Sequence, residues 1–141
     1  MNEAKNYLNQ VRQLNKKIEC IESDIEALRV EQITLSGVRM DGMPHGSGVG
    51  DPTAQKAIAL IDKLAGMESY LIEMKSRYWQ KRMEVIETIG KVSDADLNEL
   101  LYLRYVQLES FEGIAYKMNY SYRHTLRLHG RALEEVGKLI C

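Results

Sequence analysis

A seven-residue repeat of apolar residues runs through the N-terminal part of this 141-residue chain. One row of the repeat holds Ala4, Val11, Ile18 and Ile25, and the other holds Tyr7, Leu14, Ile21, Leu28 and Leu35. Four consecutive heptads, with mostly β-branched residues in the first row and mostly Leu or Ile in the second, are typical of a coiled coil. The sequence therefore predicts a long coiled-coil helix over residues 1–36.

The repeat stops at a glycine-rich segment, SGVRMDGMPHGSGVGDP, which holds five of the ten glycines and both prolines. Such a segment loses much conformational entropy on ordering, which predicts a flexible connector over residues 37–51. It is not a phosphate-binding loop, because the sequence GxxxxGK[ST] is absent. The pattern GxGxxG also fails, since Asp51 stands where the third glycine would fall and no predicted strand precedes it.

A second long helix is predicted over residues 52–90, starting at Pro52, where the missing backbone N–H is not needed. Its heptad seam holds Ala57, Leu60, Leu64, Met67, Leu71, Met74, Tyr78 and Val85. Two such helices joined by a flexible connector predict an antiparallel coiled-coil hairpin. A spare apolar row then lies beside the seam and predicts self-association, most simply as a dimer. That row holds Ile58, Ile72, Trp79 and Ile86.

Residues 91–141 show the pattern of three short helices. Gly90 can end the preceding helix and Ser93 can cap the next, which places a row of apolar residues inward. That row holds Leu97, Leu100, Leu101, Tyr105 and Leu108. Ser110 is expected to cap a second helix with an apolar stripe made of Phe111, Ile114, Ala115 and Met118. Ser121 is expected to cap a third helix over residues 122–139. Three helices with a tight turn before the last predict a helix-turn-helix domain, and hence an all-α chain.

The third helix of this domain carries an arginine stripe. Residues 113–133 contain no acid, although the whole chain has a net charge of -1. At about 100° per residue, Arg123, Arg127 and Arg131 share one face. The other face is expected to hold Tyr122, Thr125, Leu126, His129, Ala132, Leu133, Val136 and Leu139. His129 is expected to be a core histidine satisfied by a neighbouring group.

This stripe suits double-stranded DNA, because arginine binds guanine edges bidentately and also binds phosphates. The N-terminal part of a recognition helix enters the major groove, and its first turn can hold a phosphate. The expected DNA-binding residues are Lys117, Ser121, Tyr122, Arg123, His124, Arg127 and Arg131. Lys117 and Arg131 are expected to hold the DNA backbone.

The segment SFEGIAYKMNYSYRHTLRLHGRAL resembles the helix-turn-helix of sigma-70 region 4. With the AKNYLNQVRQLNKKI start and the glycine-rich middle, the whole chain resembles a family of uncharacterised prophage proteins of Gram-positive bacteria, related to the RinA-like and ArpU-like phage late-gene regulators. The resemblance implies control of phage transcription by promoter DNA binding, with host RNA polymerase as a further partner. Sigma region 2 has no counterpart, so the chain is not expected to be a complete sigma factor.

Other classes of function find less support in the sequence. No catalytic arrangement of Ser, His, Asp, Cys or Glu emerges, so no enzyme and no cofactor or metal are expected. Cys20 and Cys141 lack a CxxC partner, and no signal peptide or bilayer-spanning run is present, which predicts reduced thiols in a cytoplasmic protein without a membrane partner. The alternative to a regulator is a coiled-coil interaction or packaging protein resembling small terminase subunits, whose C-terminal domain binds protein or non-specific DNA.

Overall fold

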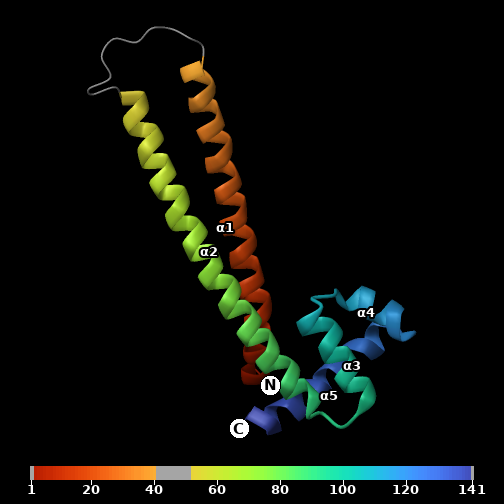
Figure 1. Cartoon of the computed structure of the whole chain (residues 1–141). Helices are drawn as coiled ribbons and strands as arrows, with labels where there is room; N and C mark the ends of the chain where they lie inside the picture. The colour runs from red at the N-terminus through yellow and green to blue at the C-terminus, as the bar shows by residue number, and fades with distance from the viewer. Residues whose placement is uncertain (1, 41–51, 141) are drawn as a thin grey trace. The chain divides into compact units, whose positions relative to one another are not determined.

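Every regular element in the described part of the chain is helical. The computed structural model describes residues 2–40 and 52–140. Its elements are α1 (Asn2–Met40), α2 (Pro52–Gly90), α3 (Ala95–Leu101), the π-helical turn η1 (Tyr102–Val106), α4 (Phe111–Met118) and α5 (Tyr122–Ile140), as shown in Figure 1. The expected all-α class is therefore confirmed for these residues. None of the described helices is both long and apolar enough to span a bilayer.

The two long helices differ in how well their ends were predicted. Helix α2 has the predicted bounds, 52–90, whereas α1 continues to Met40, beyond the predicted end at residue 36. A single interior glycine such as Gly37 costs a helix only about 1 kcal/mol relative to alanine, so it does not by itself end one. The remainder of the predicted connector, residues 41–51, lies outside the described residues.

The chain divides into two compact units, and each contains parts of both long helices. The inner unit is Lys16–Lys75, and the terminal unit combines Met1–Asn15 with Ser76–Cys141. The sequence placed the C-terminal domain in residues 91–141 alone. The terminal unit is larger, because it also takes in the first turns of α1 and the last turns of α2.

In the inner unit, α1 and α2 bury apolar residues of the predicted seams. These are Ile18, Ile21, Ile25, Ala57, Leu60 and Met74. Arg29 pairs with Glu68 at 2.9 Å, and Lys75 pairs with Glu22 at 3.7 Å. Residue numbers fall along one helix as they rise along the other, so the two helices run in opposite directions across this unit. Exposed ion pairs contribute about 0–1 kcal/mol each, so the apolar seam supplies most of the stability.

The terminal unit has one continuous apolar core, to which every described helix contributes. The buried members are Ala4, Leu8 and Val11 of α1, Val85 and Ile89 of α2, Val92, and Leu97, Leu100, Leu101, Leu103, Tyr105, Val106, Ile114, Leu128, Ala132, Leu133 and Val136 of the later elements. The C-terminal helices therefore share their core with both ends of the long helices. Because of this shared core, the terminal unit includes residues that precede residue 91 in the sequence.

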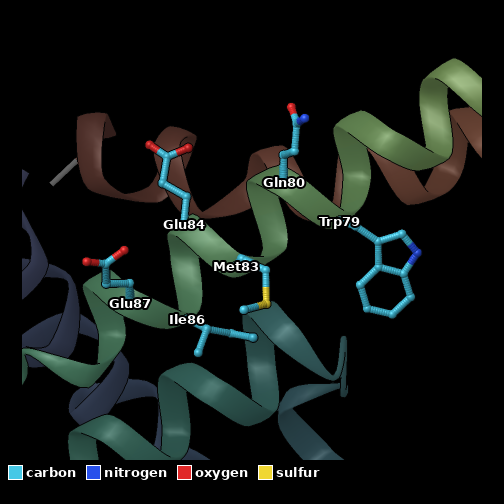
Figure 2. Close-up of a pocket in the computed structure, with 6 residues that line it drawn as sticks. All are labelled: Trp79, Gln80, Met83, Glu84, Ile86 and Glu87. Atoms are coloured by element: carbon cyan, nitrogen blue, oxygen red, sulfur yellow. The ribbon is translucent and has the colours of Figure 1, made fainter.

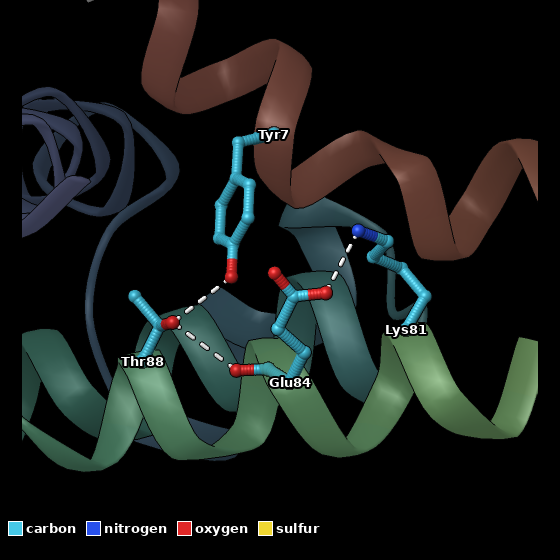
Figure 3. A network of polar contacts seen from close by, with 4 residues as sticks. All are labelled: Tyr7, Lys81, Glu84 and Thr88. Carbon is cyan, nitrogen blue, oxygen red and sulfur yellow. Dashed lines mark hydrogen bonds and ion pairs between the residues drawn. The ribbon is translucent and has the colours of Figure 1, made fainter.

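Polar contacts fix the ends of α1 and α2 within the terminal unit (Figure 3). The hydroxyl of Tyr7 contacts that of Thr88 at 2.9 Å, and the Thr88 hydroxyl donates to the Glu84 carbonyl at 3.1 Å. Since Thr88 uses its proton in the second bond, Tyr7 is the donor in the first. Lys81 pairs with the Glu84 carboxylate at 2.8 Å on the same helix.

The caps of the short helices match the sequence at one of the two positions described here. Asp94, and not Ser93, caps α3, because its carboxylate accepts from the backbone N–H groups of Asp96 at 2.9 Å and Leu97 at 3.1 Å. Serine and aspartate are both good N-caps, so the sequence pattern alone does not distinguish Ser93 from its neighbour Asp94. Ser110 caps α4 as expected, accepting from the N–H of Gly113 at 3.1 Å.

The first of the short helices ends sooner than the pattern indicated. Leu97, Leu100, Leu101 and Tyr105 are buried as expected. Leu108 is only half-buried, and it lies past the end of η1 with a positive φ of 60°. Leu108 is therefore not part of the helix, and the helical spacing that predicted its burial does not hold there.

Candidate nucleic-acid interface on helix α5

A tight turn connects α4 to α5. Asn119 adopts the left-handed conformation with φ 59° and ψ 39°, and the N–H of Tyr120 donates back to the Ala115 carbonyl at 3.0 Å. Asparagine tolerates this conformation better than most residues, which suits a helix C-terminus. Ser121 then accepts from the backbone N–H of His124 at 3.1 Å and so caps α5, as expected.

The arginine stripe is exposed. Arg123, Arg127 and Arg131 all lie on the solvent side of α5, and within the described residues none of them forms an ion pair. Three unpaired guanidinium groups at i, i+4 and i+8 give this face a concentrated positive charge. Glu134 is exposed one turn further along the helix.

The buried face of α5 differs in detail from the predicted one. Its members are Thr125, Leu128, His129, Ala132, Leu133 and Val136. Leu128 was missed, although it lies three residues after Thr125 and four before Ala132, which is the spacing of one helix face. Leu126, expected to face inward, is 38% exposed. Tyr122 and Leu139 were also expected inside and are exposed, so these three positions are corrections.

Lys117 is already neutralised by an acid outside α4. Its Nζ pairs with Glu109 Oε1 at 2.5 Å. Glu109 lies in the connection before α4, just outside the acid-free segment, so inspection of residues 113–133 could not reveal it. Of the expected backbone-binding pair, Lys117 therefore carries a competing partner and Arg131 does not.

His124 lies in a small polar cluster at the start of α5. Its ring meets the ring of Tyr120 edge-on at 4.8 Å, and the Tyr120 hydroxyl donates to Asp96 Oδ2 at 2.9 Å. The hydrogen bond to Asp96 raises the pKa of Tyr120 above its ordinary value. These contacts hold the turn against α3, and they leave His124 half-buried beside the arginine stripe.

A buried hydrogen bond fixes α5 against η1. Tyr105 and His129 Nε2 are 2.5 Å apart, and the two rings are stacked. Burial lowers the pKa of His129 to about 4, with the charge of Arg104 acting in the same direction. Burial also raises the pKa of Tyr105 to about 12. His129 is thus a neutral core histidine with a hydrogen-bonded neighbour, which confirms its sequence interpretation.

The spare apolar row of α2 is distributed over both compact units. Ile58 and Ile72 belong to the inner unit and are 60% and 71% exposed. Trp79 belongs to the terminal unit and is 54% exposed, whereas Ile86 is half-buried because it packs against the core. Figure 2 shows that Trp79, Met83 and Ile86 line one shallow pocket together with polar residues of α2. Met83 was missed, although it follows Trp79 by one helical turn.

In the ranges 2–40 and 52–140, no group of three or more His, Cys, Asp or Glu side chains is arranged to hold a metal ion. No known protein-family model, curated protein or solved structure matches the chain.

Proposed function

We propose that the chain is a DNA-binding transcriptional regulator of the phage type, in which α4 and α5 act as a helix-turn-helix and residues 122–139 read promoter DNA. The observation that carries this proposal is the unpaired arginine stripe, which starts in the first turn of α5, directly after the tight turn at Asn119. A recognition helix places that end in the major groove. Host RNA polymerase is proposed as a second partner only through the resemblance to sigma-70 region 4.

The roles of individual residues follow from their positions on α5. Arg123 and Arg127 lie nearest the N-terminus and, with Tyr122 and His124 beside them, are proposed to reach guanine edges or nearby phosphates. Arg131 is one turn further along and is proposed to hold a phosphate, as is the exposed N-terminus at Ser121. Lys117 is expected to contribute less than any of the arginines, because binding DNA would require its ion pair with Glu109 to be given up.

The arginine stripe is tested by the double variant Arg123→Ala/Arg127→Ala. We expect a large loss of affinity for duplex DNA. The magnitude of the slope of log affinity against log salt should fall by about 0.9 for each of the two arginines that neutralises a phosphate. Lys91→Ala/Lys138→Ala is the matched control, because it removes the same charge, and Lys138 already pairs with Glu135. Equal affinities and equal salt slopes for the two double variants would exclude contact between DNA and this face.

Selection of bound duplexes from a random pool at two salt concentrations separates a regulator from a packaging protein. A regulator should enrich one sequence, because base-edge contacts discriminate by about 1–3 kcal/mol per good bidentate pair. A protein that binds only the DNA backbone should enrich none. Loss of the enriched sequence in the Arg123→Ala/Arg127→Ala variant would assign the readout to α5.

We further propose that the chain forms a dimer through a coiled coil of α1 and α2, with Ile58, Ile72, Trp79 and Ile86 at the contact between copies. The support is the exposure of Ile58, Ile72 and Trp79, large apolar side chains that a soluble monomer gains nothing by exposing together. Two recognition helices per dimer would then bind paired half-sites. Light scattering at micromolar concentration should give the mass of two chains.

Variants of that row distinguish the contributions of the two units to the dimer. Ile72→Ser changes a residue of the inner unit, and Trp79→Ser changes one of the terminal unit. Each should shift the mass towards one chain while the helical circular dichroism signal is retained. Ser76→Ala, at an exposed residue outside the row, is the control. A mass of one chain for the unmodified protein would exclude the dimer.

A further inference from the structure

Two arginines in the terminal unit lie close together without an acidic partner. Arg12 of α1 donates from its Nη2 to the backbone carbonyl of Arg104 in η1 at 3.3 Å. Arg104 donates from its Nη1 to the Glu109 carbonyl at 3.0 Å, and its guanidinium lies 4.1 Å from the centre of the Phe111 ring. Both side chains are thus held in place by neutral groups.

The charges of this arginine pair have no ion-pair partner among the described residues. The carboxylate of Glu109 is occupied by Lys117. Glu112 acts on Arg104 electrostatically without pairing with it. Burial lowers the pKa of Arg104, and the neighbouring charge of Arg12 lowers it further. Two cations held side by side are a destabilising arrangement unless a ligand compensates them.

Each guanidinium keeps a terminal nitrogen for such a ligand. The Nε atoms of both arginines are buried without a partner. Arg12 Nη1 and Arg104 Nη2 form no hydrogen bond within the described ranges, so each can donate to a ligand. Two anchored guanidinium groups with free N–H donors are suited to an oxyanion with several acceptor oxygens, such as phosphate.

The place of the pair in the fold indicates which phosphate. Arg104 lies over Phe111, the first residue of α4. In a helix-turn-helix, the helix before the recognition helix crosses the DNA backbone. The pair therefore lies beside the end of α4 where a backbone phosphate would pass.

We propose that Arg12 and Arg104 together bind a phosphate of the DNA backbone next to the start of α4, so that the first turns of α1 take part in DNA binding. This inference rests on the DNA binding proposed above for α5. It extends the interface to the start of α1, where Arg12 lies about ninety residues before Arg104 in the chain. The contact proposed there is independent of the DNA sequence.

The decisive variant is Arg12→Gln. Glutamine retains an amide that can donate to the Arg104 carbonyl, and it removes one charge of the repelling pair. We expect the salt slope of DNA binding to fall by about one and the affinity to fall roughly eightfold at 0.1 M salt, with the selected DNA sequence unchanged. The melting temperature without DNA should stay equal or rise, because the repulsion is relieved. A purely structural role would lower both the melting temperature and the affinity, and would overturn the proposal.

Two further variants and one anion test complete the design. Arg12→Lys keeps the charge and should keep the salt slope, whereas Arg29→Gln makes the same change at an arginine already paired with Glu68 and should change nothing. An Arg12→Gln slope equal to that of the unmodified protein, which itself binds DNA, overturns this inference and leaves the function of α5 intact. Failure of the unmodified protein to bind any DNA overturns both. Stabilisation by millimolar inorganic phosphate at constant ionic strength, lost in Arg12→Gln but with an unchanged DNA slope, assigns the pair to a free anion and overturns the DNA contact.

Discussion

The neutral state of His129 makes the stability of the terminal unit dependent on pH in a calculable way. The ordinary pKa of a histidine, 6.5, applies to the unfolded chain, and burial lowers the native value to about 4. Above pH 6.5 neither state is protonated, so the full stability is present. As the pH falls from 6.5 towards 4, the unfolded chain takes up a proton that the native protein does not, and stability is lost.

The size of this loss follows from the same two values. With the ring fully shielded from water, the linkage amounts to about 2 kcal/mol at pH 5 and about 3 kcal/mol at pH 4. His129 as a residue is 9% exposed, and the remaining access of solvent reduces the effect. We therefore expect a loss of about 1–2 kcal/mol between pH 7 and pH 5.

The measurement compares the protein with its His129→Gln variant, which does not titrate but retains a side chain able to hydrogen-bond with Tyr105. Urea unfolding is followed at several pH values by the fluorescence of Trp79, the single tryptophan of the chain, which belongs to the terminal unit. All other titrating groups are common to both proteins, so the difference between their unfolding free energies isolates His129. If that difference is constant between pH 7 and pH 5, the histidine is not buried in its neutral form.

Three further changes test the local structure of the terminal unit. Asp94→Ala should lower the unfolding free energy by about 1 kcal/mol, because α3 loses its capping carboxylate. Ser93→Ala should change the unfolding free energy by no more than about 0.5 kcal/mol. If urea unfolding gives the larger loss for Ser93→Ala, Ser93 is the cap. Asn119→Gly should retain or slightly raise the melting temperature, and Asn119→Val should lower it, since only glycine adopts the left-handed conformation without strain. Equal melting temperatures of the two variants would contradict the conformation of the turn. Tyr105→Phe should lose about 1–3 kcal/mol, because His129 is left unsatisfied in the core, and a calorimetric loss no larger than that of the exposed Tyr116→Phe would show that the hydrogen bond contributes little.

Periodic patterns predicted the local structure of the chain well. The heptad row from Ala4 to Ile25 is buried, and the caps at Ser110 and Ser121 form as expected. These features depend on residues within one or two helical turns, where spacing alone determines which side chains share a face. The exposure of the arginine stripe was predictable for the same reason.

Contacts between distant segments were not predictable from these patterns. The pairing of Lys117 with Glu109 and the approach of Arg12 to Arg104 depend on tertiary structure. The sequence thus predicted the positive charge of the candidate site and the helix that carries it. It did not predict which of the basic residues already pair with an acid.

The composition of the terminal unit also bears on how the chain folds during synthesis. Ala4, Leu8 and Val11 leave the ribosome before the residues that cover them, which lie beyond a stretch of sixty residues, Lys16–Lys75. Closing so long a loop costs little more than closing a short one, but it must wait until the C-terminal helices have been made. The inner unit can pair its helices earlier and thereby bring both ends of the terminal unit together. Pairing of the two helices within Lys16–Lys75 can therefore promote assembly of the terminal unit, whose two sequence segments it separates.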